Sequence, residues 1–151
     1  MKIKLKDRTE YRNKQAQLHR IDGPAAIWSN GTQEYFINGQ RHREDGPALI
    51  LLDGSQFYYQ NGKRHREDGP AVIHSDGLQE YWQNGQLHRE DGPAHINPNG
   101  HQAYYQNNQL HRTDGPALIY SNGSQEYYLN GKQLTKHQYE NQNSIQNRIQ
   151  K

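Results

Sequence analysis

The 151-residue sequence predicts an all-β protein, a single-layer antiparallel meander of about ten strands with a short C-terminal helix cap. A 23-residue unit occurs five times in tandem, without insertion or deletion. Each unit has two short stretches of β-forming residues around an Asn-Gly or Asp-Gly pair, which is the strongest local signal for a hairpin. Only 30% of residues are hydrophobic, and the mean hydropathy is −1.32. That is too little for a thick core, but it suits an array in which each repeat packs on its neighbours.

Residues 1–16 are expected to form an N-terminal cap strand. The segment from Lys2 to Tyr11 can pair with the first repeat. Its alternating lysines would then shield the sheet edge from unwanted strands, because charged side chains discourage edge-to-edge pairing.

The repeats follow this cap and share an invariant framework. Each unit carries His-Arg-x-Asp-Gly-Pro-Ala, then Ile before the first turn, then Gln-x-Tyr-aromatic and a second turn at Asn38-Gly39 or its equivalent. Eleven of the 23 positions are identical in every unit. The five units cover residues 17–39, 40–62, 63–85, 86–108 and 109–131.

The first turn sets the expected register. A two-residue type I′ turn at the first Asn-Gly pair would place Ile27 opposite Glu34. It would likewise place Ala25 opposite Phe36. Side chains alternate between the faces of a strand, so one face would carry the nearly constant Ala25, Ile27 and Phe36. The other face would carry residues 26, 28, 33 and 35, of which the first two vary between repeats. We interpret constancy as packing and variation as recognition.

After the repeats, residues 132–151 predict a helical cap. Thr135 suits the N-cap position, and Gln138 would complete a capping box with it. Leu134 and Tyr139 would form the hydrophobic staple. The helix face over the last hairpin would carry Tyr139, Gln142, Ile145 and Ile149. The alternative is a Gln- and Asn-rich tail that is partly disordered.

Residues 58–77 read Tyr-Tyr-Gln-Asn-Gly-Lys-Arg-His-Arg-Glu-Asp-Gly-Pro-Ala-Val-Ile-His-Ser-Asp-Gly. This pattern, and residues 17–131 as a whole, resemble the MORN repeat (membrane occupation and recognition nexus). The sequence departs from that family in having Asp-Gly-Pro-Ala, one position later, where a Gly-x-Gly usually follows the Asn-Gly turn. It therefore looks like a divergent MORN-like variant. The resemblance implies a twisted single-layer sheet used for protein interaction, often as a homodimer, and it implies no catalytic residues.

Arrays with the His-Arg-x-Asp-Gly-Pro-Ala form are also similar to repeat proteins of bacteriophages and large DNA viruses. This similarity implies a viral protein that inhibits or sequesters a host factor in the host cytoplasm. The start of the chain lacks the apolar stretch of a signal peptide, so a cytoplasmic protein is expected on that ground as well.

The invariant histidines do not predict a metal site. Equivalent residues of successive repeats are two strands apart, about 9–10 Å, whereas metal ligands lie within about 2–2.3 Å of the ion. We expect Asp22 and its equivalents to accept backbone N–H groups in Asx-type turns, with His19 and Arg20 bonded to neighbouring turns. The histidines concerned are His19, His42, His65, His88 and His111.

Nothing in the sequence predicts catalysis or a cofactor. There is no cysteine, no serine-nucleophile motif, no phosphate-binding Gly-rich loop and no dinucleotide fingerprint. An active site usually needs one special constellation in a pocket, and five identical copies are the opposite of that.

The expected function is therefore that of a rigid, non-enzymatic scaffold that binds a protein partner along its sheet. The expected contact residues are Trp28, Leu49, Leu51, Tyr58, Tyr81, Tyr104 and Tyr120, with Arg41 and Arg64 tuning association.

Binding of single-stranded nucleic acid or a nucleotide is the alternative function. Aromatic rings interleaved with arginine suit stacked bases. Acidic neighbours weaken the field of each arginine, however, as in Arg43-Glu44-Asp45. Membrane binding is not expected, because the sequence has no basic amphipathic helix and no lipidation signal.

Overall fold

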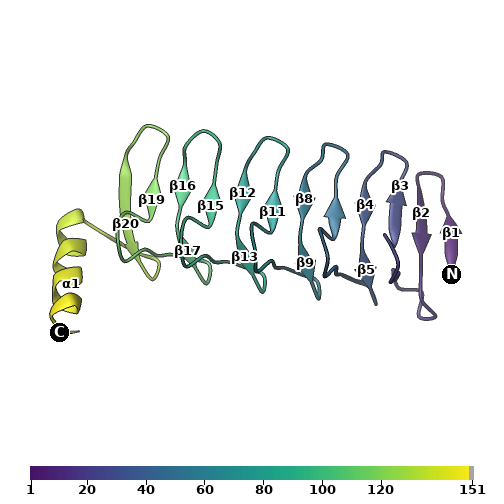
Figure 1. Cartoon of the computed structure of the whole chain (residues 1–151), viewed down its shortest axis with the longest axis horizontal. Coiled ribbons are helices and arrows are strands. Elements are labelled where there is room, and N and C mark those ends of the chain that lie inside the picture. The colour runs from purple at the N-terminus through teal and green to yellow at the C-terminus, as the bar shows by residue number, and fades with distance from the viewer. Residues whose placement is uncertain (150–151) are drawn as a thin grey trace. The chain divides into compact units, whose positions relative to one another are not determined.

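The computed structural model describes residues 1–149, without the side chains of 143 and 145–149. It confirms an antiparallel β-meander followed by a C-terminal helix. The main sheet has 13 strands, and further strands form small two-stranded hairpins (Figure 1). The chain divides into two compact units, Met1–Gly85 and Gln86–Lys151.

The first unit contains the cap and the first three repeats. Its main-sheet strands, in spatial order, are β1 (Lys2–Lys4), β2 (Arg8–Tyr11), β3 (Ala26–Trp28), β4 (Gln33–Glu34), β7 (Leu49–Ile50), β8 (Gln56–Phe57), β11 (Val72–Ile73) and β12 (Gln79–Glu80). Its small hairpins pair β5 (Phe36–Ile37) with β6 (Gln40–Arg41) and β9 (Tyr59–Gln60) with β10 (Lys63–Arg64). The unit ends after β13 (Trp82–Gln83).

The second unit begins with β14 (Gln86–Leu87) and has the same plan. Its main-sheet strands are β15 (His95–Ile96), β16 (Gln102–Ala103), β19 (Leu118–Ile119), β20 (Gln125–Leu129) and β21 (Lys132–Leu134). Its small hairpin pairs β17 (Tyr105–Gln106) with β18 (Gln109–Leu110), and α1 (Lys136–Ile149) follows β21.

Each repeat therefore contributes a two-stranded hairpin to the predicted meander, and a small hairpin such as β5–β6 joins it to the next repeat. The invariant tyrosine lies at the junction between them. The N–H of Tyr35 donates to the oxygen of Ala48 in the next repeat at 2.7 Å, and its own oxygen accepts the N–H of His42 at 3.1 Å. The strand thus leaves the main sheet at this residue and continues into the small hairpin, at the other end of the repeat from the main turn (Figure 1).

The type I′ turn lies at the second Asn-Gly pair and not at the first. Asn38 and Gly39 both have positive φ, 48° and 78°, and Phe36 pairs with Arg41 across them. At the first pair only Gly31 has a positive φ, 92°. The N–H of Gly31 donates to the oxygen of Trp28, and the N–H of Trp28 to the oxygen of Thr32. This is a three-residue loop with a type I turn and a glycine bulge.

The side chain at the first turn explains this choice. Asn30 Oδ1 accepts the N–H of Thr32 at 2.9 Å, which holds the type I conformation. The same bond forms in the other four repeats, to Asp53, Asp76, Asn99 and Asn122.

The longer loop shifts the predicted register by one residue. Glu34 lies opposite Ala26 and not opposite Ile27, and Gln33 lies opposite Ile27. Ala25 does not pair with Phe36: its N–H donates to the oxygen of Glu34 at 2.8 Å, as in a bulge. The predicted assignment of residues to the two faces was therefore wrong.

The corrected register divides the repeat into two distinct faces. One side, here called the constant face, carries the equivalents of Ile27, Gln33 and Tyr35, which are identical in all five repeats. The other side, here called the variable face, carries the equivalents of residues 26, 28, 34, 36 and 41. Successive occupants of position 26 are Ala26, Leu49, Val72, His95 and Leu118; those of position 28 are Trp28, Leu51, His74, Asn97 and Tyr120.

Both ends of the array are capped. At the N-terminus, β1 leads into β2, which pairs with both β1 and β3, so the cap comprises two strands and not one. At the C-terminus, Thr135 Oγ1 accepts the N–H of Gln138 at 3.2 Å, and Gln138 Oε1 accepts the N–H of Thr135 at 2.9 Å. The predicted capping box is therefore confirmed. The predicted helix-face residues Ile145 and Ile149 lie outside the described side chains.

Tyr139 connects the helix to the last repeat. Its ring lies 4.8 Å from the ring of Tyr127, and its hydroxyl oxygen accepts the N–H of Gly115 at 2.8 Å. Only 4% of Tyr139 is exposed. The helix thus covers the tyrosine that has no following repeat to cover it.

We predict that Tyr139→Ala lowers the free energy of unfolding by about 3 kcal/mol, because it removes a buried aromatic side chain. Tyr139→Phe should cost only about 1 kcal/mol, the value of the lost hydrogen bond. Glu140→Gln is the control, since the exposed Lys136–Glu140 pair should contribute less than about 0.5 kcal/mol. Urea unfolding measures all three, and an unchanged Tyr139→Ala variant would show that the helix does not cap the sheet.

Candidate interaction surface

The invariant arginine stacks on the invariant tyrosine of the preceding repeat. The guanidinium carbon of Arg43 lies 4.0 Å from the centre of the Tyr35 ring, and that of Arg66 lies 4.1 Å from the Tyr58 ring. Arg112 lies 3.9 Å from the Tyr104 ring in the same way. Such cation–π contacts join consecutive repeats across the constant face.

The rest of the invariant motif holds this arginine in place. Arg43 Nε donates to Asp45 Oδ1 at 2.8 Å, and its terminal nitrogen donates to the oxygen of Pro47 at 3.4 Å. A Cβ on Gly46 would lie only 3.0 Å from the guanidinium carbon, so a larger residue here would crowd the arginine. The arginine thus accounts for the Asp and the Gly that follow it in each repeat.

The invariant aspartates serve the arginines rather than Asx-type turns, which corrects the expectation for Asp22. Arg20 Nε donates to Asp22 Oδ1 at 2.9 Å. This hydrogen bond is the main reason that the pKa of Asp22 lies below its usual value of 3.8. The pKa values of the four equivalents are lowered for the same reason; they are Asp45, Asp68, Asp91 and Asp114.

The invariant histidines bond to neighbouring turns, as predicted. His42 Nδ1 accepts the N–H of Asn61 at 3.1 Å, where Asn61 opens the type I′ turn of the same repeat. His65 accepts the N–H of Asn84 in the same manner. Among the residues that the structure describes, no group of three or more His, Cys, Asp or Glu side chains could hold a metal ion.

An open hollow of about 740 Å³ lies between two of these motif loops in the first unit. It is lined by Arg20, Asp22, Tyr35, Arg43 and Asp45, among others. Its two arginines and two aspartates already bind one another. These four charged side chains are therefore already bound within the fold.

On the variable face of the first unit, buried carboxylates organise aromatic and basic side chains. Glu34 is 8% exposed. It accepts a hydrogen bond from Trp28 Nε1 at 2.8 Å and another from an Arg41 nitrogen at 2.6 Å. Glu10 is bound by Arg8 and Arg12, and the bond from Arg8 is the main cause of its lowered pKa. Each carboxylate fixes the side chains beside it in one orientation.

Arginines and aromatic rings alternate along this face. Arg8 lies 4.5 Å from the centre of the Trp28 ring. Arg41 lies 5.4 Å from the Phe36 ring, and Arg64 lies 4.9 Å from the Trp82 ring. The half-buried Leu49 and Leu51 come from β7 and from the residue that follows it. The next residue, Leu52, is 71% exposed at the turn.

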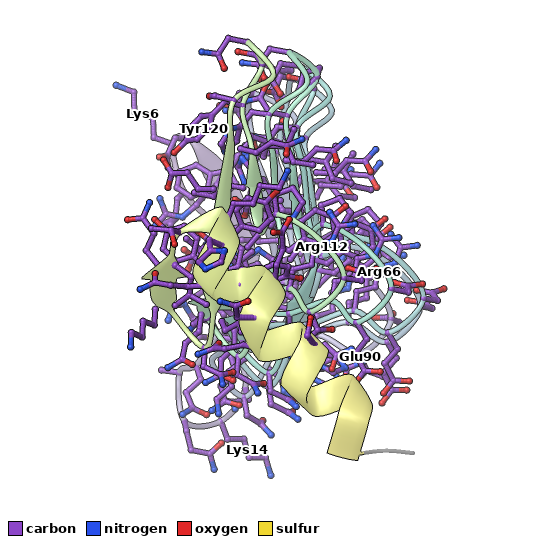
Figure 2. All side chains as sticks on the ribbon, turned by 90° about the vertical axis from the view of Figure 1, so that its left-hand side faces the viewer. Lys6, Lys14, Arg66, Glu90, Arg112 and Tyr120 are labelled. Carbon is purple, nitrogen blue, oxygen red and sulfur yellow. The ribbon has the colours of Figure 1, made fainter. Side chains whose placement is uncertain are left out.

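The second unit presents different chemistry at the same positions. The His101 ring lies 5.8 Å from the His95 ring and 5.3 Å from the Tyr120 ring. The hydroxyls of Tyr120 and Tyr128 both donate to Glu126, and these bonds are the main cause of the raised pKa of each tyrosine. Figure 2 shows Tyr120 on the side of the unit away from Arg112 and Glu90.

The expected contact residues divide between the two faces. Trp28, Leu49, Leu51, Tyr120, Arg41 and Arg64 lie on the variable face. Tyr58, Tyr81 and Tyr104 belong to the constant face by their place in the repeat, and Arg66 and Arg112 stack on two of them. Sequence reasoning missed position 34, which is occupied by Glu34, Phe57, Glu80, Ala103 and Glu126. Its variation was a usable signal, but the shifted register hid which face it belongs to.

No protein-family model matches the sequence, and no curated protein matches it. No helix in the described part of the chain is long and apolar enough to cross a membrane.

We predict that the protein loses stability as the pH falls below the usual aspartate value of 3.8. A lowered folded-state pKa stabilises the fold above the unfolded value, and this contribution disappears as the pH falls through the folded value. Asp68→Asn should therefore destabilise the protein at pH 7, and progressively less as the pH falls below 3.8.

Asp76→Asn is the matched control for this experiment. Asp76 only accepts a backbone N–H in its turn, and three repeats already carry Asn at this position. Thermal unfolding at several pH values measures both variants. A loss of stability in Asp68→Asn that does not shrink as the pH falls below 3.8 would contradict the role of the ion pair.

Proposed function

We propose that this protein is a non-enzymatic repeat scaffold that binds a protein partner along its variable face. The proposal depends on one observation, the separation of invariant and varied residues by the corrected register. The invariant side chains are used in contacts between repeats. The variable face also joins repeats, as Arg41 and Glu34 do, but its residues differ from repeat to repeat as a recognition surface needs.

The chemistry of the variable face favours a protein over a nucleic acid. Trp, Tyr and Arg are the residue types that most often dominate protein interfaces. Each arginine of this face lies beside a carboxylate: Arg8 and Arg12 share Glu10, Arg41 binds Glu34, and Arg64 lies 3.9 Å from Glu80. Nucleic-acid binding depends on cations that remain available to phosphates.

The MORN-like resemblance belongs to the same proposal. The repeated hairpins are compatible with a divergent member of that family, acting by protein interaction. The finer proposal is that this is a viral protein whose partner is a host factor in the cytoplasm. The scaffold would inhibit or sequester that factor. The resemblance alone supports this finer statement.

The repeats themselves supply substitutions that test the proposal without unfolding the sheet. Leu49→His, Leu51→Asn and Arg64→Leu each introduce a residue found at the same position of another repeat, namely His95, Asn97 and Leu87. We predict that the triple variant keeps its unfolding midpoint and binds the partner at least about 30-fold more weakly, as expected for the loss of a hot spot of about 2 kcal/mol.

A photo-crosslinking amino acid at position 51 identifies the partner, and one at the exposed position 67 on the other side is the control. The proposal is supported by a discrete protein adduct that forms from position 51 and not from position 67. This adduct should be lost when the crosslinking protein also contains Leu49→His and Arg64→Leu. An adduct that nuclease destroys would favour the nucleic-acid alternative. Adducts from position 67 alone, or binding unaffected by the triple substitution, would refute the proposal.

A further inference from the structure

The N-terminal edge strand β1 presents free backbone groups to its outer side. The N–H of Leu5 donates to the oxygen of Arg8, and the N–H of Arg12 donates to the oxygen of Met1. Hydrogen bonding alternates along an antiparallel pair, so Ile3 bonds to Glu10 while the N–H and C=O groups of Lys2 and Lys4 point away from β2. No described strand covers this edge. At the other edge, β21 contacts α1.

Positive charge is concentrated in the segment that contains this edge. Residues 1–16 hold six of the 18 Lys and Arg residues but only two of the 16 Asp and Glu residues, a net charge of +4. The chain as a whole has a net charge of +2, so the remainder is net negative. An acidic partner segment would be attracted to this end of the sheet.

The two sides of β1 differ in chemistry. Lys2 and Lys4 lie opposite Tyr11 and Thr9, on the constant face. Ile3 lies on the other side, opposite Glu10, and Leu5, which is 44% exposed, follows it two residues later. A strand added to this edge would thus meet lysines on one side and apolar side chains on the other.

We propose that β1 accepts an extended segment of a partner protein, added antiparallel, in which acidic and apolar residues alternate. Acidic side chains of the added strand lie beside Lys2 and Lys4, and its apolar side chains lie beside Ile3 and Leu5. Backbone hydrogen bonds supply the attachment, and the alternating side chains supply the selectivity.

A second copy of the chain is a poor occupant of the same edge. Two β1 strands in an antiparallel pair would place lysines beside lysines, which is unfavourable across strands. The lysines therefore exclude self-pairing while they favour an acidic strand. The edge thus selects its partner partly by repelling other copies of this chain.

The probe is an eight-residue fluorescent peptide of alternating Glu and Val, titrated with the full chain at low and high salt. We expect saturable binding that weakens with salt. Peptides with Lys in place of Glu, or with all Glu residues grouped at one end, should bind at least about tenfold more weakly. Equal binding of the grouped peptide would overturn the proposal.

Backbone methylation separates strand addition from simple charge attraction. In an antiparallel pair, residues directly opposite each other share a face, so the residues opposite Lys2 and Lys4 are the Glu residues and their N–H groups face β1. Methylating the Glu nitrogens should abolish binding, whereas methylating the Val nitrogens should leave it intact. Equal effects of the two, or loss on Val methylation alone, would refute the antiparallel arrangement.

On the protein, the variant with Lys2→Gln and Lys4→Gln should bind the peptide at least about tenfold more weakly. The variant with Lys14→Gln and Lys132→Gln removes the same charge away from the edge, in the loop after β2 and on β21, and should bind as the parent does. Equal weakening in both variants would show that only net charge matters. The variable-face triple variant should bind the peptide normally, so this proposal and the proposed function can fail separately.

Discussion

The fold depends on the invariant arginine of one repeat stacking on the invariant tyrosine of the repeat before it, as Arg43, Arg66 and Arg112 do. Arg43 contacts the Tyr35 ring, and Asp45, Gly46 and Pro47 hold or accommodate the guanidinium. Because two-stranded hairpins of this length are not stable alone, contacts between repeats must stabilise the array. Most invariant residues serve this contact, or the turn that His42 binds. A repeat with so little apolar material can fold because invariant polar residues join it to its neighbours.

The same contact determines which residues are free to vary. The main sheet is one layer, so the invariant residues of the repeat contact gather on the constant face, while the variable face packs with residues that differ between repeats. There the occupants of one position range from Trp28 to Asn97. Buried carboxylates such as Glu34 still fix the orientation of their neighbours, so the varied side chains are held rather than mobile. A surface of this kind combines changeable chemistry with little loss of conformational entropy on binding.

The sequence was sufficient for the hairpins and the capping box at Thr135, because each depends on local signals. It was also sufficient for the period and the histidine contacts, because the invariant motif recurs in every repeat. It was not sufficient for the register. Asn-Gly fits both a type I′ turn and a type I turn with a glycine bulge, and these loops differ by one residue. One residue is enough to exchange the faces of a strand. The distinguishing feature was present: the first turn accepts Asp53 and Asp76, whereas the second keeps Asn, which adopts positive φ more readily. The arginine–tyrosine stack joins residues from different repeats, so no local pattern reveals it.

The separation of faces rests on the hairpin register, and NMR measures that register directly. In the third repeat Ile73 lies opposite Gln79, at a pair whose backbones approach most closely because the flanking His74 and Leu78 form the hydrogen-bonded pair. We expect a strong cross-strand nuclear Overhauser effect between the α-protons of Ile73 and Gln79. An effect between the α-protons of His74 and Gln79 in its place would pair Ile73 with Glu80 and return Glu80 to the face of Ile73. The distinction between a constant and a variable face would then be lost.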